Sequence, residues 1–231
     1  MRMRNKLILI KEILTLPRVE IFFSCKCNAC FNIFKKFTKP HPRYFIIKNK
    51  TKGVELINSW QFKNSTEYIA FVKGKNSADY FSRRAIKLGY SFRYITPEKH
   101  IAEIFSINTS SDIRQGKAMS ASYNDKEIVF PADNHNKYFG VFKEDKLVAY
   151  LWVSIHGELA ILTRLLGHAG FLKDGIMYLM LTATIAEIID NYKEIKFIMY
   201  DTFFGASDGL RLFKSRLGFR PYNVKWKFDK C

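Results

Sequence analysis

The segment 176–189 constrains the fold of this chain more than any other feature of the sequence. Its residues are apolar on nearly every side of a helical projection, whereas a surface helix keeps a polar face. A helix of this composition needs neighbours all round, so we expect it to be central and buried, running to about Asn191. A strand over 159–166 and a glycine-containing loop over 167–175 come before it, and this order predicts an α/β fold.

Local patterns on either side of this unit predict further elements. Ser77 and Gly89 are suited to begin and end a helix with an apolar stripe. Residues 138–142 and 147–155 have the pattern of two strands joined by a tight turn. We also expect strands over 90–95, 195–200 and 224–228, and helices that start at Thr96-Pro97 and span 207–217.

The first 66 residues differ from the rest in charge. They hold 14 Lys and Arg against three Asp and Glu, in a chain whose net charge is +17. We therefore expect a small basic N-terminal module over 1–66, followed by a second domain over 67–231 with its core from about residue 90. A field of this sign attracts polyanions such as RNA, an anionic membrane surface or an acidic glycan, although solubility alone would also account for it.

Within this basic module we expect an amphipathic helix over 5–16, a loop-rich stretch around its cysteines and prolines, and a small hairpin formed by 44–47 and 54–62. Cys25, Cys27 and Cys30 are close enough in the chain to share a zinc ion with His41. The alternative is three reduced thiols packed as small apolar groups. We assign no metal site from the sequence.

Membrane and export signals are weak in this sequence. No apolar run reaches the roughly 18 residues that a bilayer-spanning helix needs, and the longest, 176–186, contains Thr182 and Thr184. Near the start, Lys11 and Glu12 interrupt the apolar run 7–10 before a signal-peptide core is complete. We therefore expect a cytoplasmic protein.

From Tyr90 onward the order of elements resembles the GNAT acyltransferase fold. The run 212–221, with Leu217-Gly218-Phe219 at its centre, is similar to that family's last helix and its turn into the final strand. The resemblance covers 90–231 and implies a mixed twisted sheet with helices on both faces. It also implies an enzyme that moves an acyl group, expected to be acetyl, from acetyl-CoA or another acyl-CoA to an amine or hydroxyl acceptor.

The resemblance places coenzyme A at the loop before the apolar helix, where backbone N–H groups and the helix dipole favour a diphosphate. The cofactor-binding residues it implies are Leu165, Leu166, Gly167, His168, Ala169, Gly170, Lys173, Asp174, Gly175 and Ser207. Two features depart from the family pattern. The glycines of the loop are more widely spaced, and Lys214 stands where the family commonly has a Tyr that protonates the leaving thiolate.

An amine attacks a thioester only when neutral, so the reaction needs a base. We expect Asp201, at the end of a strand that opens on the cleft, to be that base, with a pKa raised by partial desolvation; a turn or cap role is the alternative. Glu158 is a second candidate base, and Tyr200 a candidate acid. Arg114, Gln115 and Lys117 lie where the acceptor would bind, unless that stretch is only a solvated loop.

Two other functions remain open. Transferases of the Fem type, which have GNAT-related domains, take an aminoacyl group from tRNA, and the basic charge and altered loop suit that donor. Alternatively, the chain is a non-catalytic RNA- or membrane-binding protein built on the same fold, since a fold alone does not establish activity.

Overall fold

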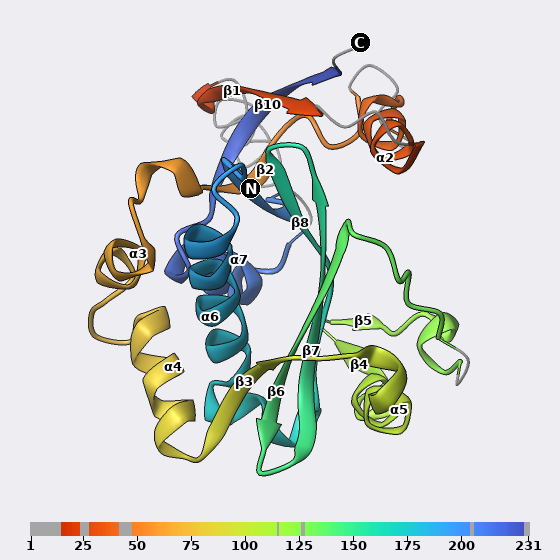
Figure 1. Cartoon of the computed structure of the whole chain (residues 1–231), viewed down its shortest axis with the longest axis vertical. Helices are drawn as coiled ribbons and strands as arrows, with labels where there is room; N and C mark the ends of the chain where they lie inside the picture. Colours follow the sequence, from red (N-terminus) through yellow and green to blue (C-terminus); the bar gives the residue numbers. More distant parts are fainter. Residues whose placement is uncertain are drawn as a thin grey trace, which may run out of the picture.

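The computed structural model describes residues 15–23, 28–41, 48–114, 116–125, 128–203 and 206–228 (Figure 1). Within these residues a mixed eight-stranded sheet has the order β1-β10-β2-β9-β8-β7-β6-β3. Two neighbouring pairs, β1 with β10 and β8 with β9, are parallel. A separate two-stranded ribbon pairs β4 with β5.

The strands of the main sheet are β1 (Arg18–Phe23), β2 (Val54–Asn58), β3 (Tyr90–Tyr94), β6 (Asn136–Lys143), β7 (Lys146–His156), β8 (Leu159–Gly167), β9 (Phe197–Thr202) and β10 (Arg220–Phe228). The ribbon consists of β4 (Ile113–Arg114) and β5 (Lys117–Ala118). The α-helices are α2 (Asn28–Thr38), α3 (Ser65–Phe71), α4 (Ala78–Lys87), α5 (Ile101–Thr109), α6 (Ile176–Asn191) and α7 (Asp208–Arg216). Short 3₁₀ turns are η1 (Ser59–Gln61), η2 (Pro97–His100), η3 (Ala121–Tyr123) and η4 (Ala169–Asp174).

Helices cover both faces of the sheet, as expected from the resemblance to the GNAT fold. Figure 1 shows α3, α4, α6 and α7 on one side and α5 on the other. The central helix α6 is confirmed as buried, because residues on most of its sides, including Ile176, Leu181 and Ile188, are almost inaccessible to solvent. It packs in the main hydrophobic core between the sheet and helices α3 and α4.

The central part of the chain follows the sequence pattern closely. Strands β6 and β7 form the expected hairpin, closed by the two residues Glu144 and Asp145. Ser77 caps α4 by accepting a hydrogen bond from the backbone N–H of Tyr80 over 3.2 Å. Gly218 has a φ of +92°, so it leaves α7 in the left-handed conformation that glycine adopts most readily.

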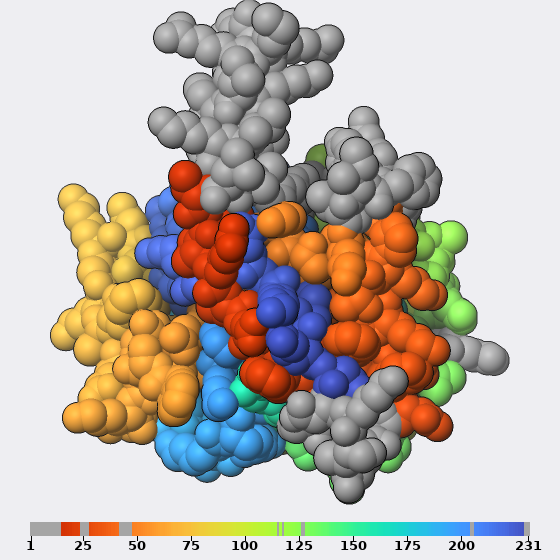
Figure 2. Space-filling model, turned by 90° about the horizontal axis from the view of Figure 1, so that it is seen from above, coloured from red at the N-terminus to blue at the C-terminus, as the bar shows by residue number. Residues whose placement is uncertain are grey.

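The main sheet contains strands from both sides of residue 66, the boundary at which the charge of the sequence changes. Strand β1 adds to β10, and β2 lies between β10 and β9, so the expected basic module supplies two strands of the main sheet. Seen from above, β1 (red), α2 (orange) and β10 (dark blue) lie side by side (Figure 2). They share a second hydrophobic core, which includes Ile21, Phe23, Phe37 and Trp226.

Two sequence expectations for this region are corrected. The stretch after Cys27 is not loop-rich, because residues 28–38 form helix α2. Its Phe31, Phe34 and Phe37 repeat every three residues and contact aromatic rings of β1 and β10. The segment 54–58 is a strand, but it pairs with β9 and β10. Residues 44–47, the other arm of the expected hairpin, lie outside the described residues, as do residues 5–14 of the helix expected over 5–16.

Among the described residues, every helix is too short or too polar to cross a membrane.

Candidate functional site

The strands β8 and β9 are paired only over their first residues. Their parallel register runs from Leu159 opposite Phe197 to Ile161 opposite Met199, although β8 continues to Gly167 and β9 to Thr202. The recorded pairing therefore ends part-way along both strands. Beyond it, the peptide groups of β8 on its β9 side are not paired with β9 in the recorded register.

Strand β8 also carries a bulge in this region. Trp152 faces Arg164 and Val153 faces Leu162, which leaves Thr163 as an extra residue in β8. The hydroxyl groups of Thr163 and Ser154 are 2.9 Å apart. Because a bulge turns neighbouring peptide groups out of the ladder, it changes the direction of the backbone donors just where β8 separates from β9.

The loop after β8 uses its own backbone donors. The N–H of His168 donates to the carbonyl of Val148 over 2.8 Å. The next two backbone N–H groups are also hydrogen-bonded. Ala169 N–H donates to Ser110 Oγ over 3.0 Å, and Gly170 N–H donates to the ring Nδ1 of His168 over 3.2 Å. Phe171 N–H donates to the carbonyl of His168 over 3.0 Å. These groups would have to be released before the loop could hold a diphosphate.

The start of α6 is covered by other parts of the chain. Gly175 has a φ of +91°, and a Cβ atom there would lie 2.6 Å from the carbonyl oxygen of Phe81 in α4. The carboxylate of Asp174 accepts a hydrogen bond from the hydroxyl of Tyr90 over 2.6 Å. Burial and this carboxylate raise the pKa of Tyr90 to about 12. A carbonyl oxygen and a carboxylate next to the helix start make it a poor place for a second anion.

Arg114 holds this loop against the end of α5. Its guanidinium donates to the carbonyl oxygens of Gly167 and Ile107 over 2.9 and 2.8 Å, and to Ser110 Oγ over 2.9 Å. Burial lowers the pKa of Arg114. Since most of its donors bind the protein itself, Arg114 positions the loop. Gln115 and the side chain of Lys117 lie outside the described residues.

The remaining implied cofactor residues are spread around the loop. Leu165 is partly buried and Leu166 is buried in the core near α5. Lys173 is exposed in η4, and Ser207 caps α7 by accepting from Leu210 N–H over 3.4 Å. Burial and the nearby cations Lys146 and Arg114 lower the pKa of His168.

Asp201 lies near the end of β9, but the expected desolvation is wrong. Its side chain is 60% exposed and pairs with the ammonium of Lys50. Its backbone has a φ of +55°, a left-handed conformation. The carboxylate is therefore held at the surface of the site by a cation from the segment before β2.

Glu158 is at the other end of β8. Its carboxylate accepts from the backbone N–H of Phe22 over 2.9 Å and pairs with Lys196 over 2.8 Å. This carboxylate thus ties β1 to the start of β8, and the structure does not bring it together with Asp201 or the loop. Tyr200 is packed against Phe219, and burial raises its pKa.

Sequence reasoning missed that two ionisable residues beside β9, Lys214 and Glu55, are buried. Lys214 of α7 is 1% exposed, and its Nζ donates to the carbonyl oxygen of Thr202 over 3.1 Å and lies 4.7 Å from the centre of the Tyr200 ring. Glu55 of β2 is 3% exposed. Burial lowers the pKa of Lys214 and raises that of Glu55, while each partly offsets the effect on the other. The sequence signal was available, because Lys214 lies on the same helical face as Leu210 and Leu217.

Neither the family models nor the curated protein sequences include a match to this chain. Among solved structures, FemX superposes with a TM-score of 0.53 and 12% identity, covering 74% of this chain and 59% of that one. L-PGS from Bacillus licheniformis gives a TM-score of 0.47 and 14% identity, covering 73% and 58%. A tandem GNAT protein from the clavulanic acid biosynthesis pathway gives 0.41 and 15%, covering 58% and 43%.

The sheet order and the similarity to FemX support a GNAT-like fold, a mixed α/β sheet with a buried helix after the glycine loop. At 12% identity the likeness to FemX concerns the fold. The chain spans less than two thirds of the length of each of these three structures.

Proposed function

We propose that this chain is a transferase that moves an acyl group from an activated donor to an amine or hydroxyl acceptor, with the reacting carbonyl held where β8 and β9 diverge. The observation that carries the proposal is the end of the β8–β9 pairing after Ile161 and Met199. A carbonyl placed there meets backbone N–H donors of bulged β8, which stabilise the negative oxygen that forms during acyl transfer.

Lys214 supplies the second element of the proposed mechanism. The acceptor forms a bond to the carbonyl carbon and loses a proton, and the bond to the leaving oxygen or sulfur then breaks and its electron pair stays on that atom. A buried cation beside β9 stabilises this developing charge, and its lowered pKa eases transfer of a proton to the leaving group. We propose Asp201 as the group that takes the acceptor's proton, directly or through a water.

We infer that the donor is aminoacyl-tRNA in preference to acyl-CoA. The backbone donors of the loop 168–171 are already bound, and Asp174 adds a negative charge at the helix start. Both features oppose a diphosphate in the place where the resembling family binds coenzyme A. The net charge of +17 and a basic face on α4, where Arg84 and Lys87 are exposed beside Tyr80, support a nucleic-acid donor.

The test compares the two donors on the same protein. Binding is measured by calorimetry with acetyl-CoA, with charged tRNA and with the same tRNA uncharged, and loss of the labelled aminoacyl group from tRNA is followed with an amine acceptor present. The proposal expects preferential binding of charged tRNA and acceptor-dependent loss of label. If the protein binds acetyl-CoA and transfers its acetyl group, the donor is acyl-CoA and not aminoacyl-tRNA. If it binds tRNA without any transfer, the result supports a non-catalytic RNA-binding protein.

A further inference from the structure

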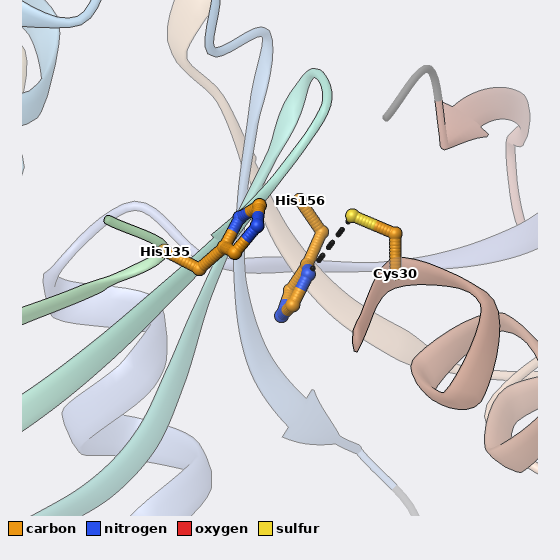
Figure 3. A group of neighbouring side chains, drawn as sticks. All are labelled: Cys30, His135 and His156. Carbon is orange, nitrogen blue, oxygen red and sulfur yellow. Dashed lines mark hydrogen bonds between the residues drawn. The ribbon is translucent and has the colours of Figure 1, made fainter. Parts of the chain in front are cut away.

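Three potential metal ligands from distant parts of the chain meet at the end of β7. Cys30 belongs to α2, His135 immediately precedes β6 and His156 ends β7 (Figure 3). One ligand atom from each lies within 4.8 Å of the other two. Cys30 and His156 are 0% and 3% exposed, and His135 is partly buried.

The spacing of these atoms suits a tetrahedral zinc ion. The Sγ atom of Cys30 is 3.3 Å from Nδ1 of His156. Zinc binds sulfur at about 2.3 Å and imidazole nitrogen at about 2.0 Å, so a tetrahedral site holds these two atoms about 3.5 Å apart. The Sγ atom of Cys30 and Nδ1 of His156 would need to move apart only slightly to bind a zinc ion between them.

Both imidazoles are prepared to act as ligands. Nδ1 of His135 lies 3.0 Å from the carbonyl oxygen of Ile155; a hydrogen bond there places the proton on Nδ1 and leaves Nε2 as a lone-pair donor, a common arrangement of metal-bound histidines. Nδ1 of His156 faces the Sγ atom of Cys30 (Figure 3). The two rings are stacked, with centres 5.6 Å apart.

We propose that Cys30, His135 and His156 form a zinc site in the reduced protein. Cys30 is disulfide-bonded in this structure, and the other three cysteines of the chain, Cys25, Cys27 and Cys231, lie outside the described residues. A disulfide sulfur has no charge to offer a cation. A phosphine supplies the two electrons and is oxidised to its oxide, water supplies two protons, and two thiols result; Cys30 then loses its proton when zinc binds.

The site is separate from the proposed transfer site. His156 faces Leu159 at the start of β8, whereas Gly167 at its other end faces Ala149. The proposed zinc ion would join α2 to the adjacent ends of β6 and β7, next to Phe23 and the second hydrophobic core. With three protein ligands the fourth tetrahedral position is left to water, and the ion would fix the N-terminal helix against the sheet.

Zinc binding is tested on the full-length chain. The protein is reduced with a phosphine without oxygen, freed of metal, and titrated with Zn²⁺ and, separately, with Co²⁺, whose visible spectrum reports tetrahedral sulfur and nitrogen ligands. We expect one ion per chain, a sulfur-to-cobalt absorption band and a higher Tm with zinc. The oxidised protein should bind at least 10-fold more weakly.

Matched variants assign the ligands. Cys30→Ser and His156→Gln should each weaken zinc binding by 10-fold or more, and Cys30→Ser should also remove the sulfur-to-cobalt band. His41→Gln, a histidine outside the cluster, should bind zinc as the unchanged protein does. If a variant fails to fold, as judged by circular dichroism, the cobalt spectrum of the unchanged chain decides. Absence of a tetrahedral cobalt spectrum in the reduced, folded protein, or equal loss in His41→Gln, overturns the proposal.

Discussion

The ammonium of Lys214 donates a hydrogen bond to the carbonyl oxygen of Thr202, the last residue of β9, over 3.1 Å. This contact brings a buried positive charge to the end of a strand that has already separated from its neighbour β8. The cation is thus positioned by α7 and β9 together. A buried ionisable group with a shifted pKa is a recurrent mark of a functional site.

Lys214→Met should lower the rate of acyl transfer by about 10² to 10³, the usual cost of losing one charge-stabilising donor. Donor affinity should change much less, because the cation acts on charge that develops during the reaction. Single-turnover rates and calorimetry separate the two effects. Lys193→Met, on a partly exposed lysine after α6, serves as the control and should keep the full rate. Equal slowing in both variants would remove Lys214 from the mechanism.

Glu55 should make stability depend on pH. Burial raises its folded-state pKa above the ordinary value of 4.5, so between these two values the folded chain binds more protons than the unfolded chain. Stability contributed by Glu55 is therefore present at low pH and is lost as pH rises from about 4.5 through the folded value. Urea unfolding across this range should show a smaller loss for Glu55→Gln. Glu194→Gln, at an exposed position, should follow the unchanged protein, and identical slopes in all three would contradict the expectation.

Gly175→Ala should be strongly destabilising. The added Cβ would lie 2.6 Å from the Phe81 carbonyl oxygen, in a backbone of φ +91°, and backbone cannot move away as a side-chain end does. We expect a loss of roughly 1 to 3 kcal/mol, the range for strained positions. Gly209→Ala in α7 has no neighbour within 4 Å and should be neutral or stabilising by about 0.5 to 1 kcal/mol. Denaturant midpoints compare them; equal midpoints would show that α4 yields to the new methyl group.

The basic face of α4 should bind nucleic acid. Replacing Arg84 and Lys87 by Glu should weaken tRNA binding and reduce the slope of log affinity against log salt, because fewer counterions are released. Arg83 on the same helix is paired with Asp79 and is left in place. Lys99→Glu, an exposed change of the same kind on η2, should alter the slope less. A salt slope that is the same in all proteins would place the nucleic acid elsewhere.

Asp201→Asn tests the proposed base. Asn accepts the left-handed backbone found here, so the fold should be kept although the pair with Lys50 is weakened. Turnover should fall by roughly 10² to 10⁴ with donor affinity almost intact. Lys50→Met breaks the same ion pair and leaves the carboxylate, so it should retain more activity. If Asp201→Asn turns over substrate as fast as the unchanged protein, Asp201 has only a structural role in the backbone turn and is not the base.

The elements that sequence reasoning predicted well are those with a local cause. The apolar surface of α6, the two-residue turn between β6 and β7 and the caps at Ser77 and Gly218 are all encoded within a few residues. Helix α2 was not predicted because the nearby Pro40 and Pro42 indicated a loop. The helical signal was the repeat of Phe31, Phe34 and Phe37 every three residues.

The site depended on contacts between distant residues, which a local pattern does not contain. Asp201 was placed correctly at its strand end, but the sequence does not show that Lys50 pairs with it. Glu158 has the right chemistry for a base. Its carboxylate instead accepts a hydrogen bond from Phe22 of β1, at the end of β8 away from Asp201. Cys30 and His156, separated by 126 positions, meet only after α2 packs on the sheet.

The parallel pairing of β1 with β10, from Arg18 opposite Asn223 to Phe23 opposite Phe228, gives the chain a constraint during its synthesis. A ribosome releases the first of these strands long before it has made the second. Until then, the edge of β1 and the aromatic residues of α2 have no native partner in β10, and they are exposed to other chains and to chaperones. We expect this sheet edge to be the last part of the chain to fold.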